Sequence, residues 1–198
     1  MRKPVPARNS AKERMLESAV HLLRDCGAAH VTIGAVITHS KSPRGSVYHH
    51  FPHGRNQILA EALERAGTVV SSAIETAHKD GATAVLDTFI TLARANIPPK
   101  RGADLGAVIA VASEAGADAD LAEQAAAIIA LWTSLVAASL EAQDVGRKEA
   151  THFATRAMAT IVGVVVLSRT SDITTPLDDI AAELTDLLPK TLSTFNTQ

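Results

Sequence analysis

Apolar residues recur every three or four positions along almost the whole chain, and proline or glycine interrupts this pattern at intervals. An α-helix places residues with that spacing on one face, whereas a half-buried strand would alternate apolar and polar residues. Ala, Leu, Val and Ile supply most of a 46% hydrophobic composition, and only 3% of the residues are aromatic. Such a mixture favours helices over sheets, so the sequence predicts an all-α protein.

The interruptions divide the chain into three parts. Residues 1–9 are basic and proline-containing, and we expect a disordered arm there. Residues 10–54 predict a three-helix helix-turn-helix domain, and residues 55–198 predict a helical bundle joined to it by a helix over 55–79. Within the bundle, we expect helices over residues 82–96, 103–115, 119–143, 147–170 and 176–195, the last stopped or kinked by Pro189.

Local signals mark the helix starts in the first module. Ser10 and Glu13 have the spacing of a capping box, in which each side chain satisfies the other residue's backbone N–H. Thr32 is the expected cap of the second helix and Ser42 that of the third, where Pro43 takes the first helical position. Further along, we expect a solvated helix junction formed by Glu114, Asp118 and Asp120.

Charge is distributed unevenly along the chain. Residues 1–55 contain nine Lys or Arg and three Asp or Glu, a net charge of +6, whereas the remainder carries ten bases and eighteen acids, a net charge of −8. A basic module on an acidic body predicts a polyanionic partner for the module alone, although a solvated basic tail would give the same asymmetry.

The sequence also indicates where the protein acts. It begins without an apolar signal core, and its longest uncharged apolar run, residues 157–167, is too short to cross a bilayer. We therefore expect a cytoplasmic protein with no membrane partner. Cys26 is the only cysteine, which excludes an intrachain disulfide, and its place on an apolar helix face predicts a packed thiol.

Residues 32–50 have the pattern of a helix, a turn and a short second helix. In a helix-turn-helix, the second helix enters the major groove with its N-terminal residues at the base edges, so that end needs small or polar groups. Arg44 can bind a phosphate or, bidentately, a guanine, and Gly45 permits close approach to the DNA backbone. Val47 and Phe51, at positions i and i+4, would form the packing face.

The segment from Thr32 to Ala62, with Pro-Arg-Gly-Ser-Val-Tyr-His-His-Phe-Pro-His-Gly-Arg at its centre, resembles the DNA-binding domain of the TetR family of repressors. Its Phe-Pro-x-Gly-Arg element is similar to that of a multidrug-type subgroup. The resemblance implies double-stranded operator DNA as a partner, a homodimer, and a helical C-terminal domain that binds a ligand and dimerises. It also implies the following DNA-contacting residues: Thr32, Arg44, Gly45, Ser46, Tyr48, His49, His50 and Arg55.

The sequence departs from the family pattern at two places. The turn of the motif often contains glycine, but this chain has Ser40-Lys41-Ser42, so Lys41 either adds a phosphate contact or changes the shape of the turn. The subgroup often has Gly-Cys-Pro near residue 102, where this chain has Gly-Ala-Asp. The second departure leaves any shared ligand or redox behaviour without support.

Two sets of apolar side chains are candidates for the C-terminal functions. Few large groups stand among many small ones, and no cluster of buried charges converges, so a small apolar or aromatic effector fits better than a sugar phosphate. Simple core packing explains the large side chains among the candidate ligand residues about equally well. The candidate ligand residues are Phe89, Ile109, Trp132 and Met158. The candidate dimer interface, on the last two helices, consists of Phe153, Ile161, Val165, Leu177, Ile180, Leu184 and Leu188.

Other functions have less support in the sequence. His49 and His53 have usable metal-ligand spacing, but Pro52 lies between them and no carboxylate completes a set. No phosphate-binding loop or nucleophile motif indicates an enzyme or a cofactor. The sequence therefore predicts a repressor released from its operator by a small apolar ligand. A DNA-binding regulator without a ligand, or a helical carrier of small molecules, remains as an alternative.

Overall fold

The computed structural model describes residues 10–97, 104–114, 118–168 and 176–189. Across these ranges every regular element is a helix, which confirms the all-α class. The N-terminal elements are α1 (Ala11–Cys26), a 3-10 turn η1 (Ala28–His30), α2 (Ile33–Ser40), α3 (Arg44–His50) and α4 (Arg55–His78). The C-terminal elements are α5 (Ala82–Arg94), α6 (Leu105–Ala112), α7 (Ala119–Glu141), α8 (Arg147–Leu167) and α9 (Pro176–Asp186).

The capping box at the start of α1 forms as its spacing predicts. The Glu13 backbone N–H donates to Ser10 Oγ at 3.2 Å, and the Ser10 N–H donates to Glu13 Oε2 at 2.8 Å. Two backbone donors that the first turn of a helix leaves unpaired are thereby satisfied. Gly27 ends α1 with φ of +77°, a conformation that glycine adopts without a steric cost and that turns the chain into η1.

The start of α2 also follows its prediction, but the start of α3 does not. The Ala35 N–H donates to Thr32 Oγ1 at 3.0 Å, so Thr32 caps α2. Pro43, not Ser42, is the residue that precedes α3, and no side-chain hydrogen bond caps that helix. The prediction for Ser42 was wrong because its hydroxyl is buried in the turn, where Oγ has no hydrogen-bond partner.

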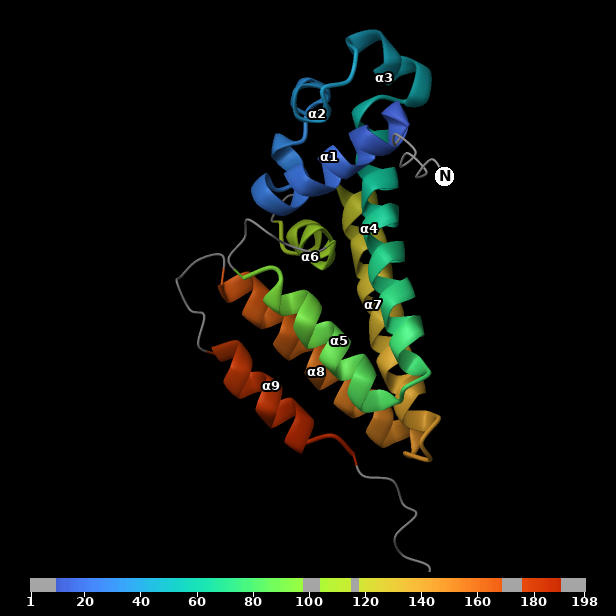
Figure 1. Ribbon diagram of the computed structural model, residues 1–198, viewed down its shortest axis with the longest axis vertical. Helices are drawn as coiled ribbons and strands as arrows, with labels where there is room; N and C mark the ends of the chain where they lie inside the picture. Colours follow the sequence, from blue (N-terminus) through green and yellow to red (C-terminus); the bar gives the residue numbers. More distant parts are fainter. Residues whose placement is uncertain (1–9, 98–103, 115–117, 169–175, 190–198) are drawn as a thin grey trace, which may run out of the picture.

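The helices form a small head on an elongated body, as Figure 1 shows. α1, α2 and α3 make the head, and α4 descends from it beside α7, while α5, α8 and α9 pack on the other side of the body. α6 lies beneath α1, and its residues from Leu105 to Val111 are all buried. A single hydrophobic cluster runs from Met15 in α1 to Leu184 in α9, so head and body share one core.

The C-terminal helices lie where they are expected but are shorter. α6 spans only Leu105–Ala112, and α9 ends at Asp186, three residues before Pro189. The part of the expected last helix beyond residue 189 lies outside the described residues. Cys26 is exposed, so the prediction of a packed thiol was wrong. Cys26 is the last residue of α1, and Gly27 turns the chain away immediately after it.

Candidate DNA-binding site

The first turn of α3 presents its functional groups to solvent. Arg44, Gly45, Tyr48 and His49 are exposed, and Tyr48 keeps 61% of its surface accessible. A Cβ added to Gly45 would meet no atom within 4 Å, so the backbone here is open to close approach by a partner. The exposed face of α3 therefore offers a cation, side-chain hydrogen-bond donors and accessible backbone to a partner.

The opposite face of α3 is anchored in the core, as the i, i+4 spacing predicts. Val47 and Phe51 are fully buried. The Lys12 ammonium of α1 lies 5.6 Å from the centre of the Phe51 ring and pairs with Glu61 of α4 at 2.8 Å. Burial of two large apolar groups fixes the rotation of a helix too short to be stable alone, which keeps Arg44 and Tyr48 pointing outward.

The remaining candidate residues of the motif differ in how exposed they are. Ser46 and His50 are half-buried, and the Ser46 hydroxyl donates to the Pro43 carbonyl at 2.7 Å. Thr32 and Lys41 are exposed. Lys41 adopts φ 52° and ψ 37°, a left-handed conformation that costs a side-chain-bearing residue energy. Lys41 thus adopts the backbone conformation that glycine usually provides in this turn.

Arg55 is turned into the protein. Its Nε donates to the Val31 carbonyl at 2.8 Å, and its Nη2 donates to the Ala28 carbonyl at 2.6 Å. Ala28 is the first residue of η1 and Val31 follows its last, so the guanidinium links the first residue of α4 to the connection between α1 and α2. In this structure Arg55 supports the head from within, and a phosphate contact would have to compete with these two bonds.

Titratable groups gather where α1 meets α2 and α6. Burial lowers the pKa of His21, and Arg24 and His39 lower it further, while Asp25 and Asp104 act in the opposite direction. The His21 and His39 rings lie 5.8 Å apart. Burial also raises the pKa of Asp104, against the attraction of Arg65, His21 and Arg24. At the junction of α1 with α2 and α6, the pKa values of His21 and Asp104 therefore depend on burial and on the charged groups nearby.

The candidate ligand residues belong to the core of the body. Phe89 and Trp132 meet edge to face with ring centroids 6.3 Å apart, and neither has accessible surface. The indole Nε1 of Trp132 donates to Ser71 Oγ of α4 at 3.1 Å. Ile109 is fully buried, and Met158 is 4% exposed. The structure brings Phe89 and Trp132 together as a packed, hydrogen-bonded pair.

The candidate dimer residues also face inward. Five of the seven are at most 3% exposed within the single chain, and the other two are half-buried. The five are Phe153, Ile161, Val165, Leu177 and Leu184; the two are Ile180 and Leu188. These side chains already pack in the protomer's core, so a second chain would contact mainly the outer sides of α8 and α9.

Sequence reasoning missed the role of Glu114. Its carboxylate accepts the Ala28 N–H at 2.6 Å and the Ala29 N–H at 3.0 Å, so Glu114 joins the body to the head and does not form part of a solvated junction. Asp118 instead caps α7, where it accepts the backbone N–H groups of Asp120 and Leu121. No local pattern signals a contact between residues 86 positions apart.

In this chain α2 is followed, after a tight turn, by the short helix α3, whose polar N-terminal end is exposed. This arrangement is typical of the helix-turn-helix class of DNA-binding proteins. The comparisons with known proteins agree. The model of the family described as "Transcriptional regulator LmrA/YxaF-like, C-terminal domain" matches residues 82–183. An HTH-type transcriptional regulator of Mycobacterium tuberculosis is 35% identical over 183 residues, which cover 89% of this chain and 93% of that protein. The chain belongs to the TetR family of helix-turn-helix transcriptional regulators, with an LmrA/YxaF-like C-terminal domain.

Solved structures share the fold at low sequence identity. A protein from Saccharomonospora viridis in complex with choline has a TM-score of 0.70 and 21% identity, covering 90% of this chain and 95% of its own. The multidrug binding protein EbrR, complexed with malachite green, has a TM-score of 0.63 and 16% identity, covering 93% of this chain and 100% of its own. These matches show that the arrangement of helices is the same in those proteins.

Proposed function

We propose that α3 reads the major groove of operator DNA and that the protein represses transcription until a small apolar or aromatic molecule releases it. The observation that carries the DNA-binding part is the two-sided character of α3, in which Arg44 and Tyr48 are exposed while Val47 is buried. Arg44 would contact a base or a phosphate, and Tyr48, His49 and Lys41 would contact phosphates. Ser46 and His50 lie half-buried on α3, and Thr32 is exposed at the start of α2.

The closed core supports the ligand-responsive part. Because Phe89, Ile109 and Trp132 have no accessible surface, a molecule can reach them only if the helices around them separate. Binding there would select a conformer different from this one, which a ligand must do to change DNA affinity. Two proteins of the same fold hold malachite green or choline, which supports an organic effector for this chain too.

A surface groove would bring the effector close to this core. A groove of about 490 Å³ lies between α4 and α7, and its lining includes Thr68, Ser71 and Leu131. Ser71 is also the acceptor of the Trp132 indole N–H. A molecule in the groove would therefore touch the hydrogen-bond partner of the only tryptophan, and Trp132 emission should report its arrival.

We further propose a homodimer through the outer sides of α8 and α9. By length and composition α7 and α8 could cross a bilayer, so the expectation drawn from the short run at residues 157–167 was wrong on this point. Only 28% and 44% of their most apolar windows is buried within the chain, so both helices leave apolar surface uncovered. On α8, Thr155 and Ala159 are exposed, and a Cβ added to Gly163 would meet no atom within 4 Å. Small residues of this kind allow close approach of a partner helix.

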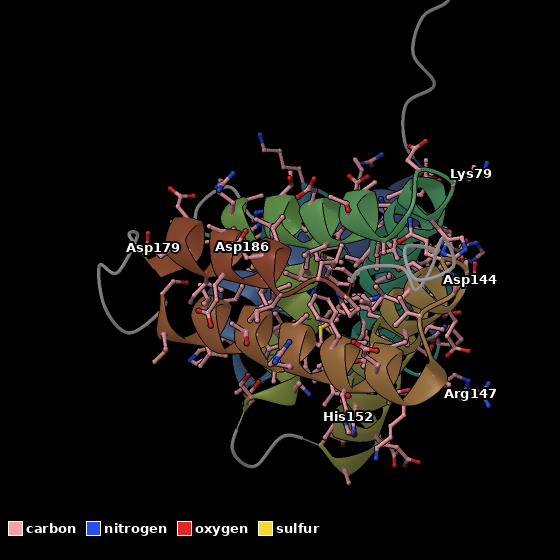
Figure 2. The ribbon with its side chains drawn as sticks, turned by 90° about the horizontal axis from the view of Figure 1, so that it is seen from below. Lys79, Asp144, Arg147, His152, Asp179 and Asp186 are labelled. Atoms are coloured by element: carbon pink, nitrogen blue, oxygen red, sulfur yellow. The ribbon has the colours of Figure 1, made fainter. Side chains whose placement is uncertain are left out.

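Charge favours the same arrangement. The described part of α9 carries Asp178, Asp179, Glu183 and Asp186 and no Lys or Arg, whereas α8 carries Arg147, Lys148 and Arg156 against Glu149. In an isologous pair, α8 of one chain can face α9 of the other, which places opposite charges together. Figure 2 views this end of the molecule, with Arg147 and His152 on α8 and Asp179 and Asp186 on α9.

Selection of duplexes from a random-sequence library, followed by gel shifts at several salt concentrations, tests the DNA-binding proposal. We expect a defined sequence preference and a steep fall of affinity with salt, by a slope of about −0.9 per neutralised phosphate. Hydrophobic and cationic compounds that change Trp132 emission are then tested for release of the selected duplex. A flat salt response, with no preferred sequence, would indicate a helical carrier instead.

A further inference from the structure

The carboxylate of Glu114 holds η1 from the side of the C-terminal domain. It accepts the Ala28 N–H at 2.6 Å through Oε2 and the Ala29 N–H at 3.0 Å through Oε1. Backbone N–H groups at the start of a helical turn have no partner within the turn, and their positive end favours an anion. One side chain that follows α6 therefore satisfies two donors in the DNA-binding head.

The guanidinium of Arg55 holds η1 from the opposite direction. It donates to the carbonyls of Ala28 and Val31 at 2.6 and 2.8 Å. The peptide groups of η1 are thus fixed by an anion on their N–H side and a cation on their C=O side. Ala28 takes part in both contacts, so a shift of either side chain must move or unpair the connection between α1 and α2.

Gly27 makes room for this contact. A Cβ at Gly27 would lie 3.3 Å from Glu114 Oε2, and the residue has φ of +77°. A side chain here would crowd the carboxylate and strain the backbone together. The approach of Glu114 therefore depends on a glycine as well as on the carboxylate itself.

Both ends of the contact lie close in the chain to functional parts. Residues Leu105 to Val111 of α6, just before Glu114, are all buried, and α6 packs against α1, α4, α7 and α8. On the other side, η1 runs directly into Val31, which is 1% exposed, and Thr32, which caps α2. A displacement of α6 can reach α2 through five successive residues without passing along α4.

We infer that Glu114 is a positioning residue for DNA binding, through which the state of the C-terminal domain sets the orientation of the helix-turn-helix. This inference rests on the proposed function and adds to it a direct contact between the end of α6 and η1. With the contact intact, η1 and the start of α2 are held in one position on the body. Without it, this connection can shift, and affinity for DNA falls with the fraction of molecules in which α2 and α3 can still bind.

The test uses the full chain and a duplex that the wild-type protein selects from a random-sequence library. Glu114→Gln and Gly27→Ala should each weaken binding of that duplex at least about fivefold, the lower end of typical coupling between sites. Glu114→Gln leaves one acceptor oxygen for two N–H donors, and Gly27→Ala crowds the same carboxylate, so both changes weaken one contact. The double variant should therefore bind within about twofold of the weaker single variant. Asp118→Asn is the matched control, since Asp118 also caps helical N–H groups but within the body; it should bind within twofold of wild type.

A second readout separates positioning from loss of stability. In the wild type, the duplex should slow amide hydrogen exchange in residues 105–111, because binding at α3 must act back on α6 by linkage. In Glu114→Gln this response should be lost while the unfolding midpoint matches that of Asp118→Asn. Wild-type affinity and an unchanged exchange response in Glu114→Gln would overturn the inference and leave the proposed function standing. Failure of the wild type to select any duplex would instead overturn the proposed function.

Discussion

The hydrogen bond between Trp132 and Ser71 makes a quantitative prediction about the body. Ser71→Ala removes the acceptor of an indole N–H whose side chain has no accessible surface. An unsatisfied buried donor costs about 1–3 kcal/mol, and the small change in volume adds little. For a chain of this size, that corresponds to a fall in the unfolding midpoint of about 2–4 °C for each kcal/mol.

Urea unfolding followed by far-ultraviolet circular dichroism measures the loss. Protein concentration is held constant, because dimerisation would otherwise contribute to the apparent stability. Trp132→Phe supplies the second side of a double-mutant cycle, since it removes the donor. In that background Ser71→Ala should cost close to nothing, which assigns the loss to the pair. An equal cost of Ser71→Ala in both backgrounds would refute the reasoning.

Three further predictions concern other parts of the molecule. Ala159→Glu changes an exposed position on α8 and should give folded monomers in light scattering. Leu184→Glu changes a position that is 2% exposed and should instead lower the unfolding midpoint. A folded dimer of Ala159→Glu would contradict the proposed interface. Lys41→Gly should stabilise the protein by about 0.5–1 kcal/mol, because it relieves the left-handed backbone at the expense of glycine's entropy, and should weaken duplex binding. Because the pKa of His21 is lowered in the folded state, the unfolded state binds the extra proton, and stability should fall as pH drops through 6.5; His21→Gln should show a smaller fall over the same range.

The sequence predicts the parts of the fold that depend on neighbouring residues. Ser10 with Glu13, and Thr32 with Ala35, satisfy backbone donors three residues away, so their caps can be read locally. The same is true of the packing face of α3, where Val47 and Phe51 follow from helical spacing. These features orient the candidate DNA-binding residues, and most of that surface could therefore be anticipated.

The features that sequence reasoning missed depend on distant contacts. Glu114 meets η1 across 86 residues, and Arg55 turns toward Ala28 across 27. Neither partner carries a side chain that would mark it as an acceptor or a donor. The apolar stripes of α8 and α9 predict burial but not what covers them, because a chain's own core and a second chain present the same chemistry. Phe153 and Leu184 pack inward for that reason.

The most direct test of the central claim is the affinity of Arg44→Ala for the selected duplex. If Arg44 contacts a base, the loss should be about 1–3 kcal/mol, about five- to 150-fold, with relaxed preference at one position of the site. Lys79→Ala is the control, because it removes the same unit charge near the opposite end of α4, as Figure 2 shows. Lys79→Ala should bind the duplex like wild type, whereas Arg44→Ala should bind it more weakly. Wild-type affinity and sequence preference in Arg44→Ala would contradict the assignment of α3 as the DNA-reading helix.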